Sequence, residues 1–235
     1  MAPDVSRFDA VLLDLFGTLV YEFPKADWDA WLATCAASLE CDPESFRDAW
    51  TATAIERQTG VAGDMAEHLR TLAARAGGWP SDAQVAEALE ARAELYRTWF
   101  VPRPGADDLL RDLRARRVPT ALVSMCAPDT PAMWRGSALA GLVDVEVFSC
   151  EVGLRKPDPE IYRAACARLG VRPERCLYVG DGSYGELSGA AALGMHAVLV
   201  SDPTEEAEML RPEVEEGWTG PTIADLREVV PMLGP

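Results

Sequence analysis

Short apolar runs recur along the chain and predict buried strands, because each run is too short for a helix of ordinary length. The first run covers residues 8–14 and ends on Asp14. The next comparable run does not come until residues 119–125. Three more follow at residues 144–150, 175–181 and 195–201. The pattern therefore predicts five strands, with a long interruption between the first two.

Amphipathic segments alternate with these strands in the second half of the chain. Helices are predicted at residues 107–117, 158–170 and 185–194, and a short closing helix is expected from Thr222 after an acidic loop. Alternation of strands and helices predicts an α/β fold with a parallel sheet and helices on both of its faces. In such sheets, ligands bind beyond the carboxyl ends of the strands.

The interruption between the first two strands has the sequence pattern of consecutive helices. Ser81 is placed to cap one helix, Pro43 follows Asp42 at the start of another, and Gly77 is placed to end a third. The four predicted helices cover residues 28–40, 43–58, 64–76 and 81–100. We therefore expect an all-helical domain at residues 21–101, inserted into a core domain formed by residues 1–20 and 102–235.

The acidic composition of the chain narrows the choice of partners. Formal net charge is −16, while 49% of the residues are hydrophobic and 26% are charged, as in ordinary globular proteins. This charge disfavours nucleic acids and anionic membranes as partners. A small anionic substrate is compatible with it, provided that a metal ion or a few lysines and arginines supply positive charge locally.

Cysteine and histidine usage argues against a zinc site. The six cysteines include no CxxC pair, and the chain has two histidines. No apolar stretch reaches the roughly 18 residues that a membrane span needs. Free thiols and the lack of a long apolar segment near the N-terminus lead us to expect a reducing, cytoplasmic environment.

Polar residues stand where the predicted strands end. Asp14, Ser124 and Asp181 stand at strand ends, the segment after the strand at residues 144–150 delivers Lys156, and Glu186 lies five residues beyond Asp181. Each one alone is readily explained as a turn former, a helix cap or a solvated side chain. Because the strand ends of a parallel sheet share one edge, all five are expected to meet in one crevice.

The segments around these residues resemble a known family. DLFGTLV, LVSMC, GLRKPDPEIY and YVGDGSYGELSGAAALGM are similar, in this order, to the four motifs of the haloacid dehalogenase-like hydrolase superfamily. The helical interruption resembles the all-helical cap that this family inserts between its first two motifs. The resemblance implies a Rossmann-like core, a helical cap and a hydrolase, most simply a phosphatase of small phosphorylated metabolites.

The resemblance also implies roles for residues that bind the transferring group. Asp14 would be the nucleophile that attacks phosphorus or carbon and forms a covalent aspartyl intermediate. Gly17 and Thr18 would let the chain turn beneath it and would belong to the residues that bind the phosphate. Ser124 and the main-chain amide of Met125 would donate hydrogen bonds to the transferring group.

A second set of implied roles concerns charge and metal binding. Lys156 would neutralise the nucleophile and the substrate. Asp14, Asp181 and the main-chain carbonyl of Phe16 would hold Mg²⁺, and Glu186 would bind a water of the ion or orient its ligands.

Phe16 departs from the pattern of the family's phosphatases. They carry a second aspartate at this position, which protonates the leaving group, and a phenyl ring cannot transfer a proton. One explanation is a phosphatase that has lost its usual general acid or has relocated it to the cap. A second is a 2-haloacid dehalogenase, since those enzymes have an aromatic residue here, although GDGSYGE resembles the phosphatases and no arginine follows DLFGTLVYEF. A third is a binding protein without catalytic activity.

Substrate choice is expected to depend on the predicted cap. Side chains there that could contact a substrate are Lys25, Trp28, Trp31, Arg57, Arg70 and Arg92. The spacing of the tryptophans is equally that of a packed helix face, and arginines on helices are commonly solvated.

Overall fold

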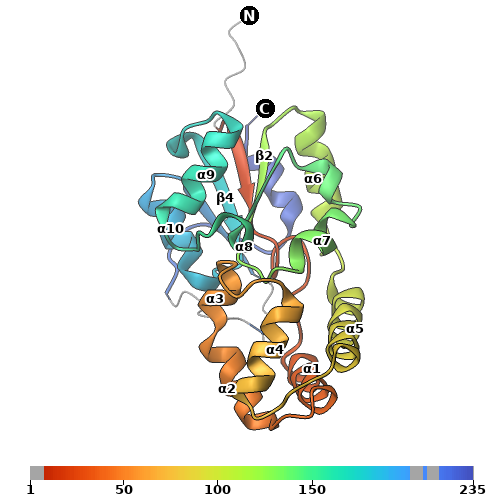
Figure 1. The fold of residues 1–235 in the computed structure, drawn as a ribbon. Helices are drawn as coiled ribbons and strands as arrows, with labels where there is room; N and C mark the ends of the chain where they lie inside the picture. The colour runs from red at the N-terminus through yellow and green to blue at the C-terminus, as the bar shows by residue number, and fades with distance from the viewer. Residues whose placement is uncertain (1–7, 202–208, 211–216, 235) are drawn as a thin grey trace, which may run out of the picture.

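The computed structural model describes residues 8–201, 209–210 and 217–234. Its centre is a six-stranded sheet in the order β3-β2-β1-β4-β5-β6, in which every neighbouring pair is parallel (Figure 1). The strands are β1 (Ala10–Leu13), β2 (Thr120–Ser124), β3 (Val145–Phe148), β4 (Cys176–Gly180), β5 (His196–Val200) and β6 (Thr222–Ile223). The predicted α/β class is confirmed.

Both faces of the sheet are buried, and β1 shows how the sequence achieves this. Val11 and Leu13 belong to the apolar cluster on one face, whereas Ala10 and Leu12 belong to the cluster on the other. Successive side chains of a strand point to opposite faces, so an apolar residue is needed at every position. The first cluster includes α6 (Ala106–Ala115) and α11 (Val229–Met232), and the second includes α9 (Pro159–Leu169) and α10 (Glu186–Ala192).

A separate group of helices lies beyond the carboxyl ends of the strands, at the bottom of Figure 1. It has its own apolar cluster, distinct from the two clusters on the sheet, to which all of these helices contribute except the one at residues 54–58. Its members are α1 (Lys25–Ser38), α2 (Pro43–Ala52), α3 (Ala54–Gln58), α4 (Met65–Arg75) and α5 (Asp82–Trp99). We call residues 25–99 the helical insertion, and its status as a separate cap domain stays a prediction.

The two connections between the insertion and the sheet run side by side. The Arg103 amide donates a hydrogen bond to the Leu19 carbonyl at 2.9 Å, and the Tyr21 amide donates to the Val101 carbonyl at 3.2 Å. The insertion therefore enters and leaves at one place. None of the helices in the described residues is long and apolar enough to cross a membrane.

The insertion begins its helices where the sequence indicates. Asp42 and Ser81 accept hydrogen bonds from backbone amides in the first turns of α2 and α5. One predicted helix, residues 43–58, is instead broken into α2 and α3 at Thr53, which has φ −102° and ψ 16°. The Thr53 hydroxyl donates to the Ala49 carbonyl at 2.7 Å, a side-chain bond of the kind that bends helices.

Short elements account for the other differences from the predictions. The predicted strand at 144–150 ends at Phe148, because Ser149–Val152 turn into helix α8. The helix expected from Thr222 was wrong at its start: Thr222 and Ile223 pair with β5 as β6, and helical structure begins at Leu226. The remaining helices are α7 (Thr130–Arg135) and the 3₁₀ turns η1 (Ala140–Leu142), η2 (Pro173–Arg175), η3 (Ser183–Gly185) and η4 (Leu226–Glu228).

Candidate active site

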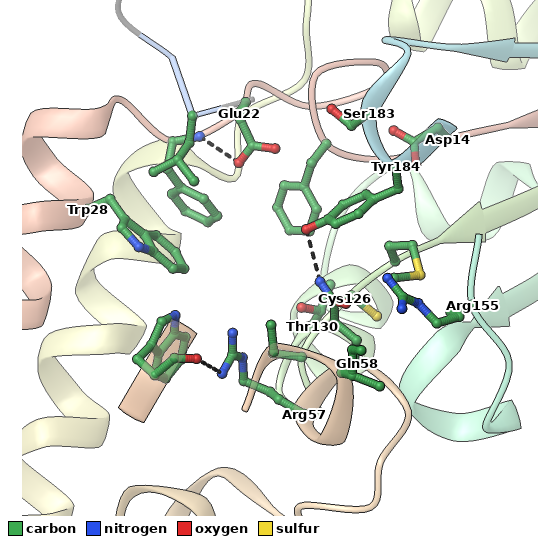
Figure 2. A pocket seen from close by; sticks show the side chains of 18 of the residues that line it. Asp14, Glu22, Trp28, Arg57, Gln58, Cys126, Thr130, Arg155, Ser183 and Tyr184 are labelled. Carbon is green, nitrogen blue, oxygen red and sulfur yellow. Dashed lines mark hydrogen bonds between the residues drawn. The ribbon is translucent and has the colours of Figure 1, made fainter. Parts of the chain in front are cut away.

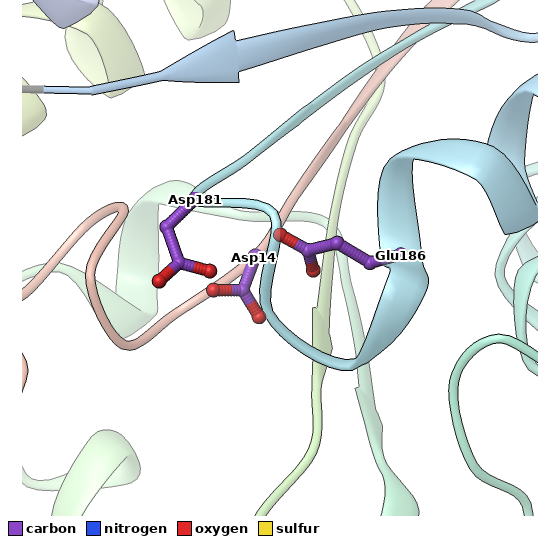
Figure 3. A group of neighbouring side chains, drawn as sticks. All are labelled: Asp14, Asp181 and Glu186. Carbon is purple, nitrogen blue, oxygen red and sulfur yellow. The ribbon is translucent and has the colours of Figure 1, made fainter. Parts of the chain in front are cut away.

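Three carboxylates meet at the carboxyl edge of the sheet. Asp14 directly follows β1 and Asp181 directly follows β4, and these two strands are parallel neighbours. Glu186 reaches the same place from the first turn of α10. One oxygen of each carboxylate lies within 4.8 Å of the others, and Figure 3 shows the three side chains converging. All three residues are buried.

Lys156 joins two of these carboxylates. Its Nζ atom donates to Asp14 Oδ1 at 2.5 Å and to Glu186 Oε2 at 2.6 Å. The Lys156 side chain is 1% exposed, so the ammonium group is removed from water and compensated by protein oxygens. It comes from the loop between α8 and α9, as its motif predicts.

Glu186 is held by two further donors that the sequence analysis missed. Its Oε2 atom accepts from the Tyr178 hydroxyl at 2.6 Å, and Oε1 accepts from the Gly182 amide at 3.0 Å. Both oxygens are thus fixed in direction. Tyr178 lies within the buried strand β4, where its sequence position gives no sign that its hydroxyl reaches Glu186.

Ser183 fixes Asp181 in a similar manner. Its amide donates to Asp181 Oδ1 and its hydroxyl donates to Oδ2, both at 2.9 Å. The Gly17 backbone packs against this carboxylate with a φ of +72°.

The predicted donors of the first two motifs also lie near this edge. Ser124 is the last residue of β2, and its buried Oγ atom makes no hydrogen bond of normal geometry in the described part of the chain. The buried Thr18 hydroxyl likewise makes no hydrogen bond of normal geometry within the described residues. Met125 contacts the motif-three loop, where its Sδ atom accepts from the Lys156 amide at 3.3 Å. The roles of these residues stay predictions.

The electrostatics of the cluster favour an added cation. Burial, followed by the charges of Glu186 and Asp181, raises the pKa of Asp14 to about 8, although Lys156 opposes the shift. Burial by itself would lower the pKa of Lys156, but the charges of Asp14 and Glu186 hold it above its usual value. A carboxylate whose pKa is raised by neighbouring negative charge gains from a cation placed beside it, because the cation stabilises the ionised form.

The donor set of this cluster suits Mg²⁺. Carboxylate oxygens are hard ligands of the type that this ion prefers, and a divalent cation would stabilise the ionised carboxylates. Asp14 Oδ2 accepts no hydrogen bond from the described residues, so it is open to a ligand, whereas both oxygens of Glu186 are already engaged. Asp14 Oδ2 is therefore the most accessible carboxylate oxygen, whereas both oxygens of Asp181, like those of Glu186, already accept hydrogen bonds. The predicted division, with Asp181 as a direct ligand and Glu186 in a supporting position, stays a prediction. The part of the Phe16 carbonyl stays a prediction.

A cavity of about 370 Å³ opens between this cluster and the helical insertion. Figure 2 shows Asp14 and Ser183 on one side of it and Arg57 and Gln58 on the other. Of the candidate side chains in the insertion, Trp28, Arg57 and Arg92 line the cavity. The other three do not: Trp31 packs behind Arg92, whereas Lys25 and Arg70 form ion pairs outside the cavity.

Phe16 forms part of the wall of this cavity. Its ring contacts three aromatic rings, with centroid distances of 5.5 Å to Phe23, 5.9 Å to Phe100 and 6.3 Å to Tyr96. The ring thus extends from the first motif into the aromatic lining of the insertion. No proton donor occupies its place.

The model of one protein family, described as haloacid dehalogenase-like hydrolase, matches residues 8–194. The chain belongs to this family. It is accordingly a hydrolase, and its relatives include phosphatases. The matched segment contains the whole carboxylate cluster and the helical insertion.

Individual relatives agree with this assignment. The chain is 33% identical over 178 residues to a phosphoserine phosphatase of Thermus thermophilus, which covers 74% of this chain and 68% of the relative. It is 27% identical to a ribulose-1,5-bisphosphate 5-phosphatase of Halopiger xanaduensis, over 94% of this chain and 98% of that one. Other curated relatives are matched over about half of their length, with 45% and 54% covered in two cases.

The fold is shared with dehalogenases too. A 2-haloacid dehalogenase from Pseudomonas syringae superimposes with a TM-score of 0.68 over 96% of this chain and 98% of its own, at 21% identity. At that identity the likeness concerns the fold alone. The fold therefore does not choose between phosphate and carbon–halogen chemistry.

Proposed function

We propose that this protein is a Mg²⁺-dependent phosphatase that hydrolyses a small phosphorylated metabolite through a covalent intermediate on Asp14. The main observation in support is that three buried carboxylates, those of Asp14, Asp181 and Glu186, converge beside the Lys156 ammonium where a cavity begins. Mg²⁺ bound by Asp14 and Asp181 would neutralise the phosphoryl oxygens and so permit two anions to approach each other.

In the first step, one carboxylate oxygen of Asp14 attacks phosphorus, while the Lys156 ammonium keeps its hydrogen bond to Oδ1. The bond from phosphorus to the leaving oxygen breaks, and that oxygen departs with its electron pair. The Lys156 ammonium and the Ser124 hydroxyl donate hydrogen bonds to charge that develops on the acyl and phosphoryl oxygens. In the second step, water attacks phosphorus, phosphate is released, and the Asp14 carboxylate is restored.

Phe16 leaves the proposed active site without a general acid for the leaving group. The departing oxygen must take its proton from water or from the substrate, because the phenyl ring has none to give. General acid catalysis is typically worth about 10²- to 10⁴-fold in rate, so alkyl phosphates are expected to turn over slowly. Aryl phosphates, whose leaving groups are acidic, are expected to be less affected.

Dehalogenation is the second candidate, and one observation favours it. A halide leaves without a proton, and the aromatic surroundings of Phe16 suit a substrate that needs no acid. The acidic cluster with a raised Asp14 pKa is the argument against it, because it suits a cation that the family's dehalogenases do without.

Charge supports the remaining features of the proposal. The net charge of −16 is unfavourable for nucleic acid and for anionic membranes, so the proposed substrate is a small anion drawn in by Lys156 and the cavity arginines. All six cysteines are free thiols, which supports the proposed cytoplasmic location.

Trapping the intermediate tests the proposal directly. The wild-type protein is mixed with Mg²⁺ and p-nitrophenyl phosphate, quenched in acid during turnover, and reduced with borohydride, which converts an acyl phosphate on Asp14 to homoserine. Mass spectrometry of the peptide that contains Asp14 is expected to show this change.

Two variants complete that experiment. Asp14→Asn is expected to abolish both turnover and labelling, whereas Asp107→Asn, which alters an exposed aspartate on α6, should preserve both. Turnover of 2-chloropropionate without Mg²⁺, and none of p-nitrophenyl phosphate, would replace the phosphatase proposal with the dehalogenase one.

A further inference from the structure

Arg57 is a buried cation without an anionic partner. Arg57 is 6% exposed, and its guanidinium forms an ion pair with none of the described carboxylates. Its Nη1 atom donates to the Trp50 carbonyl at 3.0 Å and lies 3.3 Å from His68 Nε2, so its polar contacts are neutral groups. Burial and the charge of Arg92 lower the pKa of Arg57 to about 9.

Arg92, the second arginine of this cavity, has one guanidinium nitrogen that makes no hydrogen bond within the described residues. Arg92 pairs with Asp129 and donates to the Tyr96 hydroxyl at 3.0 Å, and yet its buried Nη1 atom has no hydrogen-bond partner in the described part of the chain. Arg92 is 2% exposed. Both arginines line the cavity that begins at Asp14.

Aromatic side chains hold these two guanidiniums in place. The Arg57 guanidinium carbon lies 3.7 Å from the centroid of the Trp50 ring, and that of Arg92 lies 4.8 Å from the Trp31 ring. Cation–π contacts orient a guanidinium and recover part of its lost hydration, but they supply no counter-charge. A buried cation that lacks a counter-ion is costly unless a ligand brings one.

The position of Arg57 matches the far end of a bound substrate. Asp14 and Arg57 lie on different sides of the cavity in Figure 2, and the Tyr184 side chain reaches between them, where its hydroxyl accepts from Gln58 at 2.9 Å. A molecule whose phosphate meets Asp14 would thus direct its other end towards Arg57. Phe16 and Phe23 add apolar surface to the lining of the same cavity.

We infer that Arg57 and Arg92 form a second anion site, which selects phosphomonoesters carrying another anionic group, a carboxylate or a further phosphate, at the end remote from the scissile bond. The inference rests on the proposed phosphatase function for the orientation of the substrate. Both kinds of anion offer two oxygens to a planar guanidinium. The free Arg92 Nη1 adds a third donor from the neighbouring helix α5.

Binding of non-hydrolysable phosphonates tests this site without turnover. Calorimetry with wild-type protein and Mg²⁺ compares 4-phosphonobutyrate with butylphosphonate, which carries a methyl group where the first carries a carboxylate. We expect the carboxylate compound to bind roughly tenfold more tightly, the value of one additional charge-assisted hydrogen bond. Propane-1,3-bisphosphonate forms the second arm and shows whether a phosphate is preferred to a carboxylate.

Variants assign that preference to Arg57. Arg57→Gln is expected to equalise the affinities of 4-phosphonobutyrate and butylphosphonate, and Arg57→Lys to retain part of the difference, because it keeps the charge but loses the planar fork. Arg70→Gln, at an exposed arginine paired with Asp82, should change neither affinity. Melting curves of each variant show that it is folded at the temperature of the titration.

The outcomes separate this inference from the proposed function. Equal affinities in the wild type, or a preference that survives Arg57→Gln, would overturn the second anion site, even if p-nitrophenyl phosphate is hydrolysed. A preference that depends on Arg57, in a protein that hydrolyses no phosphomonoester, would retain the site and refute the phosphatase. A series of phosphonocarboxylates with two to five methylene groups between the phosphonate and the carboxylate shows whether equal affinities result only from an unsuitable chain length.

Discussion

A Cβ atom added at Gly17 would lie 2.6 Å from Oδ2 of Asp181, closer than real Cβ contacts come. The backbone of Gly17 in the first motif is thus packed directly against the carboxylate of Asp181 in the fourth. Gly17 also has a φ of +72°, a conformation that residues with a side chain rarely adopt. Glycine is needed at this position for two independent reasons, one local and one tertiary.

Gly17→Ala is expected to cost more stability than the same change at Gly77. Gly77 has a φ of +83° but nothing within 4 Å of an added Cβ, so Gly77→Ala measures backbone strain alone, about 1 to 2 kcal/mol. Gly17→Ala adds the collision with Asp181. Urea unfolding of both variants measures the difference, and equal losses would show that Asp181 moves aside freely.

Mg²⁺ is expected to raise the melting temperature of the wild-type protein, because an ion that binds only the folded state stabilises it by mass action. At about a hundred times its dissociation constant the gain is about 2.7 kcal/mol, or roughly 5 to 10 °C for a chain of this size. Asp181→Asn should remove most of the response, and the exposed control Asp107→Asn should keep it. A wild-type melting temperature that ignores Mg²⁺ would contradict the metal site.

Much of the fold could be predicted because its signals are local. Within the run at residues 8–14, positions 10–13 are consecutively apolar, as a strand buried on both faces must be, and the run ends on Asp14, the predicted nucleophile. β6 could not be predicted in this way, since Thr222 and Ile223 are too few to show a period and are held by pairing with β5. The break at Thr53 likewise depends on a single hydroxyl that bonds back to the helix.

The sequence could predict those candidate site residues that are charged and lie in a motif near a strand end. It could not predict residues that reach the site only through the tertiary packing. Lys156 and Asp181 stand in recognisable motifs, whereas Tyr178 reads as one more apolar residue of β4 until its hydroxyl is seen on Glu186. Arg57 lies on a short helix whose charged residues suggest a solvated face. Only the packing of the insertion against the sheet reveals that its guanidinium is buried.

Phe16→Asp is expected to separate the two catalytic proposals, because a carboxylic acid at this position helps only a leaving group that needs a proton. For a phosphatase, the variant should gain about 10²-fold or more on alkyl phosphates and little on p-nitrophenyl phosphate. A dehalogenase should instead lose turnover of 2-chloropropionate. Steady-state kinetics on the three substrates provide the measurement.

The Phe16 experiment requires a series of pH values. The pKa of Asp14 is already raised to about 8 by burial and by neighbouring carboxylates, and another carboxylate two residues away raises it further. Phe16→Asn is the matched control, since it has a similar shape but donates no carboxyl proton. An equal gain in both variants would show that removal of the ring, rather than acid catalysis, is responsible.

His68 makes the stability of the helical insertion depend on pH. It is buried, and its Nε2 atom lies 3.3 Å from Arg57 Nη1 and 3.4 Å from the Thr53 hydroxyl. Because arginine can only donate, Nε2 acts as the acceptor and the imidazole is neutral. Burial, followed by the charges of Arg57, Arg92 and Arg75, lowers the pKa of His68 to about 4.

The sign of the resulting effect follows from proton linkage. Between pH 6.5 and 4 the unfolded chain binds a proton at His68 and the folded chain does not, so the free energy of unfolding falls as the pH is lowered. His68→Gln should remove a loss of roughly 1 to 3 kcal/mol across this window while leaving the carboxylates to titrate as before. Urea unfolding at several pH values, followed by tryptophan fluorescence, compares the two slopes. Parallel slopes would mean that His68 takes up its proton in the folded protein as readily as in the unfolded chain.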